Sequence, residues 1–187
     1  MKRQGLQVYR CLDLLLACAF LPIASLICPI IIIGCLLDTG RVFFRQVRVG
    51  RMGSLFVMYK FRTMHADAPS VPTHLSDPKY VSVFGRFLRH MKLDEIPQIF
   101  NVFLGDMSFV GPRPSLPGQS ALVLARRHEG ILGLRPGITG LAQISGVDMS
   151  DLGRLIALDK RMLDTMSVKN YFTYIIFTVV PYSCHKR

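Results

Sequence analysis

Two adjacent carboxylates, Asp94 and Glu95, are the residues whose types and spacing most clearly suggest chemistry. They open the segment LDEIPQIFN, in which Pro97 falls in the first turn of an expected helix. One interpretation is structural, because Asp is a favoured N-cap and acidic side chains interact well with the positive end of a helix. Taken alone, the pair favours this interpretation. The other is catalytic, because free backbone amides favour the ionised carboxylate, and a carboxylate attacks phosphorus in aspartyl-phosphate enzymes.

Under the catalytic interpretation, Asp94 is the nucleophile and Glu95, which points elsewhere around the helix, helps to hold Mg²⁺. Proteins commonly bind Mg²⁺ through one or two carboxylates together with substrate phosphates. Nearby cations would suit the anionic oxygens of such a substrate, namely Lys60, Arg62, Arg89 and Arg113. The structural alternative for each of them is a solvated surface charge.

The composition favours a polyanionic partner and a membrane. The chain has 187 residues and a formal net charge of +11, which suits nucleic acid, phosphorylated small molecules or anionic lipid. Its mean hydropathy of +0.35 is high for a soluble protein. The sequence has no Trp and no recognised nucleic-acid-binding motif, so we expect no nucleic acid partner.

An uncharged apolar run follows Asp13 and is long enough to cross a bilayer. Basic residues flank it on both sides, so the positive-inside rule keeps both ends in the cytoplasm. This pattern predicts a re-entrant helical hairpin over residues 1–40, bent by Pro22 and Pro29, with Ser25 between them. A single kinked transmembrane helix is an equal alternative. We expect Asp13, at the membrane edge, to cap the helix or to pair with a basic residue.

The remaining residues, 41–187, are predicted to form a compact domain of the α+β class, mainly helical, with a small β-hairpin and amphipathic helices at the membrane interface. The expected elements are strands near 42–48 and 55–60, a loop over 66–80, a basic amphipathic helix from residue 84, a second helix that starts at the carboxylates, a helix before the glycine-rich stretch that begins at residue 130, a helix over 150–166, and an apolar stretch over 171–180 that lies at the interface or in the core.

Four motifs, in one order, resemble the bacterial sugar transferase family, which are monotopic polyprenyl-phosphate phosphoglycosyl transferases. The motifs are YKFRTM (59–64), FGRFLR (84–89), LDEIPQIFNVFLGDMSFVGPRP (93–114) and LRPGITGLAQISG (134–146). The family's re-entrant membrane helix matches the hairpin predicted above. The resemblance is to the small form of the family, with a catalytic domain only, so residues 41–187 would be that domain at the cytoplasmic face of the bacterial inner membrane.

The resemblance implies a reaction. A phospho-sugar passes from a UDP-sugar to undecaprenyl phosphate, which gives undecaprenyl diphosphate sugar and UMP and initiates a surface glycan such as O-antigen, capsule, exopolysaccharide or a glycoprotein glycan. Short forms of the family often use N-acetylated sugars, which favours such a donor. The alternative is a non-catalytic basic membrane protein that binds anionic lipid or nucleic acid.

The resemblance also implies residue roles. Asp94 would form a covalent phospho-sugar intermediate, and Glu95 would help to bind Mg²⁺. The expected substrate-binding residues are Lys60 and Arg62 on phosphate, Arg89 on the lipid phosphate or on a carboxylate, and Arg113 on the nucleotide diphosphate. Three further residues are expected either to support the site or to have a structural role, namely Asn101, Asp106 and Ser108.

Three features depart from the family pattern. Leu26 follows Ser25, where the family usually has a Ser-Pro pair that breaks the membrane helix. Val147 stands where the family often has Arg, so a contact of about 1.5–3 kcal/mol is absent or supplied from elsewhere. The paired tyrosines expected after Asp159 are also missing.

Overall fold

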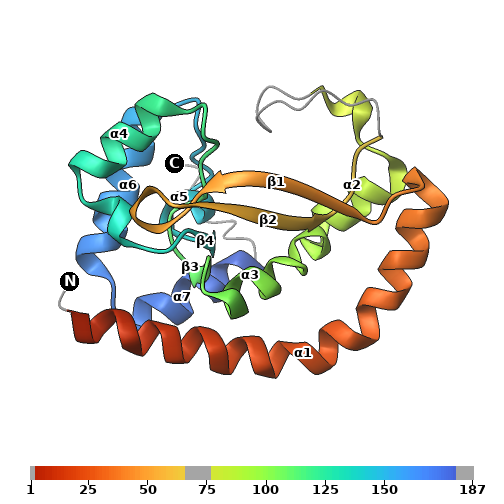
Figure 1. Ribbon diagram of the computed structural model, residues 1–187, viewed down its shortest axis with the longest axis horizontal. Coiled ribbons are helices and arrows are strands. Elements are labelled where there is room, and N and C mark those ends of the chain that lie inside the picture. The colour runs from red at the N-terminus through yellow and green to blue at the C-terminus, as the bar shows by residue number, and fades with distance from the viewer. Residues whose placement is uncertain (1–2, 66–76, 180–187) are drawn as a thin grey trace.

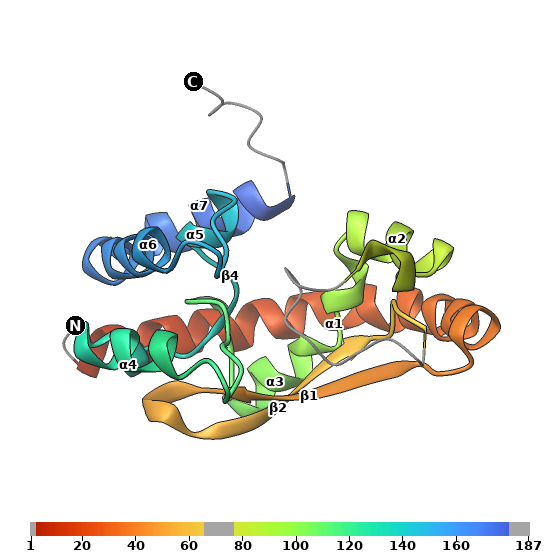
Figure 2. The ribbon, with the colours of Figure 1, turned by 90° about the horizontal axis from the view of Figure 1, so that it is seen from above.

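The computed structural model describes residues 3–65 and 77–179, which form a mixed α+β fold beside a long N-terminal helix. In Figure 1 this helix follows the lower edge, the β-hairpin runs above it, and α3 lies between the two, as it also does in Figure 2. The helices are α1 (Arg3–Thr39), α2 (Val83–His90), α3 (Gln98–Leu104), α4 (Ser120–His128), α5 (Leu141–Ile144), α6 (Leu152–Thr165) and α7 (Val168–Val179). The strands are β1 (Phe43–Val49), β2 (Leu55–Phe61), β3 (Ser108–Val110) and β4 (Gly137–Thr139).

The predicted β-hairpin is confirmed. Strands β1 and β2 are antiparallel, with Phe43 opposite Phe61 and Val49 opposite Leu55. Phe56 and Met58 of β2 lie on the buried face, as the alternation of side chains in a strand requires. Helices are also found near three further predicted positions, as α2, α4 and α6. Most of the predicted loop over 66–80 lies outside the described residues.

Strands β3 and β4 form a second, parallel pair in which two backbones approach very closely. The amide of Gly111 donates to the carbonyl of Thr139 at 2.8 Å, and the amide of Gly137 donates to the carbonyl of Pro112 at 3.0 Å. A Cβ atom on Gly137 would lie 2.0 Å from the amide nitrogen of Gly111, so only glycine fits there. This contact fixes the start of the loop that carries Arg113.

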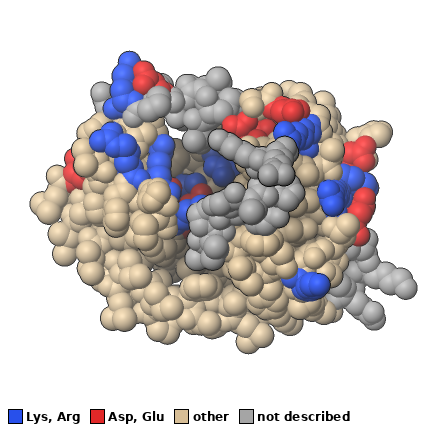
Figure 3. All heavy atoms as spheres, turned by 180° about the vertical axis from the view of Figure 1, so that it is seen from behind, with Lys and Arg blue, Asp and Glu red and all other residues tan. Residues whose placement is uncertain are grey.

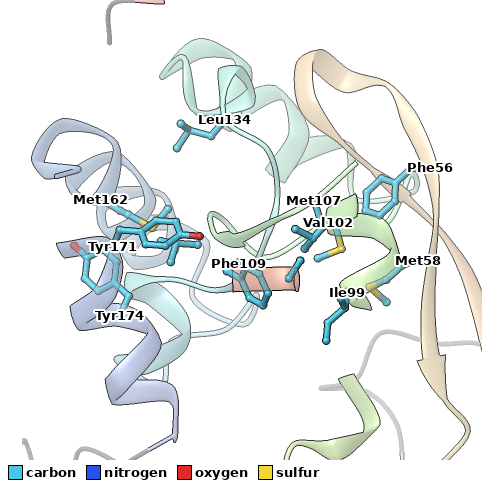
Figure 4. Packing of buried hydrophobic residues seen from close by; sticks show 12 residues of the cluster. Phe56, Met58, Ile99, Val102, Met107, Phe109, Leu134, Met162, Tyr171 and Tyr174 are labelled. Carbon is cyan, nitrogen blue, oxygen red and sulfur yellow. The ribbon is translucent and has the colours of Figure 1, made fainter. Parts of the chain in front are cut away.

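The core joins elements that are far apart in the sequence (Figure 4). It contains Met58 of β2, Val102 of α3, Phe109 of β3, Met162 of α6 and Tyr171 of α7. Because Tyr171 is fully buried, the C-terminal apolar stretch packs at least partly in the core, one of the two predicted locations.

The N-terminal part of α1 is bound to the domain by polar contacts. Oδ1 of buried Asp13 accepts from the Ser108 hydroxyl at 2.8 Å, the Phe109 amide at 3.0 Å and the Tyr171 hydroxyl at 2.7 Å. Asp13 therefore does not cap the helix, and the basic residue Arg10 acts on it through its charge without a hydrogen bond between them. The flanking base Arg10 instead donates to backbone carbonyls of α3.

The C-terminal part of α1 contacts the same domain. Cys35 is fully buried, and its thiol lies 3.7 Å from the carbonyl oxygen of Arg62. Gly34 lies against the ring of Phe84, because a Cβ atom at this glycine would lie 2.5 Å from that ring. Both parts of α1 therefore pack against the domain formed by the rest of the chain.

Residues 14–37 belong to one continuous helix that Figure 1 shows as bent. Pro22 and Pro29 lie inside it, and the Ser25 hydroxyl donates to the carbonyl of Pro22 at 2.7 Å. The helix is long and apolar enough over Gln7–Thr39 to cross a membrane. Two separate hairpin limbs are not seen, so the path of this helix through a membrane stays a prediction.

A buried ion pair joins α4 to α6, and its loss should destabilise the fold. The guanidinium of Arg126 contacts Oδ2 of Asp159 at 2.7 and 3.0 Å, and it also donates to the carbonyl of Arg113 at 2.7 Å. Arg126→Met would leave the fully buried Asp159 unpaired, and we expect the free energy of unfolding to fall by about 3–5 kcal/mol in denaturation followed by circular dichroism.

The double variant Arg126→Met/Asp159→Leu is the control, because it removes both charges from the core. It should unfold closer to the wild type than Arg126→Met does. A double variant less stable than the single one would show that the buried charge is not the cause.

Candidate functional site

The two carboxylates lie on a tight 3₁₀ turn and do not start a long helix. This turn spans Leu93–Glu95, and it follows Lys92, whose backbone is left-handed with φ of 55°. Helix α3 begins only at Gln98, and its N-cap position is Pro97. The prediction that Asp94 caps a helix was therefore wrong, because the acids belong to their own turn after Lys92, and Pro97 stands between that turn and α3.

Glu95 is held by an ion pair with the hairpin. Its Oε1 lies 2.6 Å from Nζ of Lys60 on β2, and both side chains are mostly buried. Burial raises the pKa of Glu95, but the attraction of Lys60 and Arg113 outweighs it, and the net pKa lies below the ordinary value. Glu95 is therefore an ionised group in a basic surrounding.

Asp94 has a different electrostatic environment, although it is the next residue. Burial raises its pKa above the ordinary value and Glu95 adds to the rise, while Lys60 and Arg89 oppose it. The expected lowering by a helix end is not the dominant effect, since Asp94 is not at one. Neighbouring carboxylates with opposite pKa shifts are typical of sites where two acids have different roles.

A small pocket opens beside Glu95. Three predicted residues line it (Lys60, Glu95 and Arg113), and so do two residues that the sequence analysis did not select, Arg48 and Gln98. Figure 3 shows the hollowed face of the molecule, where basic side chains gather around acidic atoms. Such a pocket suits an anionic group.

Arg48 is a buried arginine of β1, with 8% of its surface exposed. It donates to the carbonyl of Pro114 at 3.0 Å and to Oε1 of Gln46 at 2.5 Å. Burial, with repulsion from Arg113, lowers the pKa of Arg48 to about 10. The available sequence signal is the strand alternation, because Gln46 and Arg48 share one face of β1.

Of the other two predicted cations, Arg89 lies near the acid pair and Arg62 lies outside the pocket. Arg89 of α2 donates to the hydroxyl of Thr63 at 2.9 Å and is close enough to Asp94 to affect its pKa. Arg62, in contrast, lies with its guanidinium 5.9 Å from the ring centre of Phe44, and it does not line the pocket.

The three supporting residues make structural contacts. The side chain of Asn101 is fully buried, donates to the carbonyl of Val57 at 2.7 Å and accepts from the amide of Tyr59, so it joins α3 to β2. Asp106 lies 3.5 Å from the Asn101 amide group. Ser108 donates to Asp13, as described above.

Val147 packs against an apolar cluster that includes Leu122, Ala142 and Leu155. This position therefore supplies no charge to the site.

The Glu95 side chain fits Mg²⁺ that is bound largely through a substrate. Within residues 3–65 and 77–179, no three His, Cys, Asp or Glu side chains gather as a complete metal site. Mg²⁺ does not need such a cage, because it often takes one or two carboxylates and completes its shell with phosphate oxygens and water. Glu95 can supply such a carboxylate, since only its Oε1 is bound to Lys60.

Comparison with known proteins gives one matching family model and several relatives that are named as sugar or sugar-phosphate transferases. The family model for bacterial sugar transferases matches residues 5–184. The uncharacterized sugar transferase EpsL of Bacillus subtilis is 43% identical over 129 residues, which cover 67% of this chain and 62% of EpsL. The undecaprenyl-phosphate glucose phosphotransferase of Komagataeibacter xylinus is 36% identical over 154 residues, which cover 75% of this chain and 29% of that protein. The chain thus spans less than two thirds of the length of these relatives.

The raised pKa of Asp94 predicts a pH-dependent effect of Asp94→Asn on stability. Because the folded-state pKa lies above the unfolded value near 3.8, the contribution of Asp94 to stability is complete below that pH and is lost as the pH rises through the folded-state pKa. The variant does not titrate, so its melting temperature relative to the wild type should rise from about pH 4 to pH 7.

Thermal unfolding of both proteins in the same detergent and buffers measures this difference, in which the titrating groups that do not interact with Asp94 cancel. A difference that stays constant over this range would contradict the prediction.

Proposed function

Because the chain belongs to the bacterial sugar transferase family, we propose that it transfers a phospho-sugar from a UDP-sugar to undecaprenyl phosphate, with UMP as the second product. The observation that carries the proposal is the buried acid pair of opposite pKa shifts beside a basic pocket. The relative from Komagataeibacter xylinus is itself named for an undecaprenyl-phosphate acceptor.

In the proposed first step, an oxygen of Asp94 bonds to the sugar-proximal phosphorus of the donor. The bond from that phosphorus to the bridging oxygen breaks, and its electron pair leaves with UMP. Lys60 and Arg89 favour the ionised form of Asp94 that this attack requires. A phosphate oxygen of the lipid then attacks the same phosphorus, which releases Asp94 and forms the diphosphate product.

Glu95 has a different role in this proposal. Its low pKa keeps it ionised, so that it binds Lys60 and, together with substrate oxygens, holds Mg²⁺. When bound, Mg²⁺ would offset negative charge on the phosphate oxygens. The chain's own residues position the donor and exclude water from the attacking carboxylate.

The packing of α1 supports a re-entrant path at the cytoplasmic face of the inner membrane. Asp13 and Cys35 are both buried against one domain, which supports the proposal that the two ends of the apolar run lie on the same side of the membrane. A straight span would separate them. Between these ends the helix exposes large apolar side chains, including those of Phe20, Ile23, Leu26, Ile30 and Ile33.

Two short helices extend the apolar surface, which supports the proposal that they lie at the membrane interface. Both α2 and α3 contact α1. They expose Phe87 and Met91 next to the basic residues of α2, and Phe100 and Leu104 on α3. Apolar side chains bordered by cations are typical of helices that lie in a lipid headgroup layer.

The proposed product would be the first lipid-linked unit of a surface glycan. One relative, at 33% identity over 80% of this chain, is an exopolysaccharide production protein of Sinorhizobium fredii. We propose an exopolysaccharide, capsule, O-antigen or glycoprotein glycan as the end product, with an N-acetylated UDP-sugar as the first donor to test.

Asp94→Asn should abolish UMP release from the donor in detergent with undecaprenyl phosphate and Mg²⁺, with a rate loss of about 10³-fold or more because the nucleophile is gone. With donor alone, the wild type should gain the mass of the phospho-sugar and the variant should not.

Asp164→Asn, at an exposed acid of α6, is the matched control and should keep wild-type turnover. Normal turnover by Asp94→Asn would end the covalent scheme, and absence of turnover by the wild type with every UDP-sugar would favour the non-catalytic alternative.

The re-entrant path predicts that both ends of α1 are accessible from the cytoplasm only. Single cysteines at Gln7 and Arg45, in a chain without its native cysteines, should react with a membrane-impermeant reagent in inside-out vesicles and not in intact spheroplasts. Labelling of the two positions from opposite sides would instead establish a transmembrane span.

A further inference from the structure

We propose that Arg48, Gln98 and Arg113 bind the nucleoside-side phosphate of the donor, which is the leaving group when Asp94 attacks. This inference rests on the proposed function and assigns a role to two residues, Arg48 and Gln98, that the reaction scheme above does not use.

Two buried donors in the pocket have no partner. Nε of Arg48 and Nε2 of Gln98 are both buried without a hydrogen bond, and Gln98 has only 2% of its surface exposed. A buried donor without an acceptor is costly, so such groups in a pocket indicate a ligand that supplies acceptors. A fully ionised phosphate group offers acceptor oxygens and no donors, so it matches guanidinium and amide donors.

The charges in the pocket are only partly compensated, because Arg48, Lys60 and Arg113 share it with a single carboxylate, that of Glu95. The repulsion between Arg48 and Arg113 shows that the two guanidinium groups are close. Among the described residues, neither forms a salt bridge with a carboxylate, while Lys60 is already paired with Glu95. An anion between the two arginines would remove this repulsion.

The pocket lies on the Glu95 side of the acid pair, and Asp94 does not line it. The two phosphates of a UDP-sugar are joined by one bridging oxygen, so a donor whose sugar-side phosphorus meets Asp94 can place its other phosphate beside Glu95. When the bond to the bridging oxygen breaks, that oxygen takes the electron pair and charge accumulates on UMP. Donors fixed at this position stabilise the departing group.

The lining residues favour the soluble donor over the lipid as the source of the phosphate. They come from β1, β2, the Leu93–Glu95 turn, the start of α3, the Arg113 loop and β4, and none comes from α1. The lipid phosphate would instead approach from the membrane helix. Arg48 is oriented for this purpose, because its bonds to Pro114 and Gln46 fix the guanidinium and leave Nε free.

Gln98→Glu tests the inference without a large change of shape. It places a carboxylate in the pocket with Arg48, so the melting temperature should stay the same or rise while the affinity for UMP falls about 10-fold or more. Gln98→Met, which removes the donor without adding charge, should weaken UMP binding by about 3–10-fold. Calorimetry on the detergent-purified full chain measures these values, with uridine as the ligand that lacks the phosphate.

The matched control is Arg51→Gln. Arg51 also binds a backbone carbonyl, that of Gly133 at 2.9 Å, but it lies outside the pocket. The affinity of the Arg51→Gln variant for UMP should equal that of the wild type. UMP binding that is unchanged in both Gln98 variants would overturn the inference.

Two further outcomes separate the inference from the proposed function. In turnover assays, Gln98→Met should raise KM for the UDP-sugar and leave KM for undecaprenyl phosphate unchanged; the opposite pattern would overturn the assignment in favour of a lipid-phosphate site. The binding assay needs no turnover. If the wild type binds UMP in a Gln98-dependent way but never releases UMP from a donor, the proposed function fails and the nucleotide phosphate site is supported.

Discussion

The contact between Lys60 and Glu95 is the interaction on which the site depends. It joins the β-hairpin to the turn that carries both acids, at a distance of 2.6 Å and mostly out of water. A buried carboxylate without such a partner would protonate or destabilise the fold. Because Lys60 compensates Glu95 more fully than Asp94, the two neighbours differ in pKa direction, and this difference makes separate roles possible.

The backbone around the acids explains why Asp94 has this environment. The left-handed conformation of Lys92 separates the acids from α2, and Pro97 stands between them and the start of α3. The acids are thereby turned toward β2 and the Arg113 loop, and they are not left at an exposed helix end. The loop itself is held by the glycine contact between β3 and β4 and by Arg126, whose guanidinium binds the carbonyl of Arg113.

Much of this arrangement could be predicted from the sequence, since strand alternation located the hairpin and helical spacing located α2. The acid pair and Lys60 were found by residue type and by resemblance. The 3₁₀ turn was missed, because a left-handed lysine has no sequence signal comparable to glycine. Arg48 and Gln98 were missed because their importance comes from unpaired buried donors, which only the packing of β1 against α3 and the Arg113 loop reveals. Asp13 was misassigned because its partner Tyr171 is 158 positions away.

The burial of Asp13 also has a consequence for biosynthesis. Helix α1 leaves the ribosome before α7, which carries the last of the three donors to Asp13. Until α7 has been made, α1 therefore carries a carboxylate whose set of binding partners is incomplete. Helix α1 can dock completely only after α7 has been synthesised, so its docking follows the synthesis of every element between the two helices.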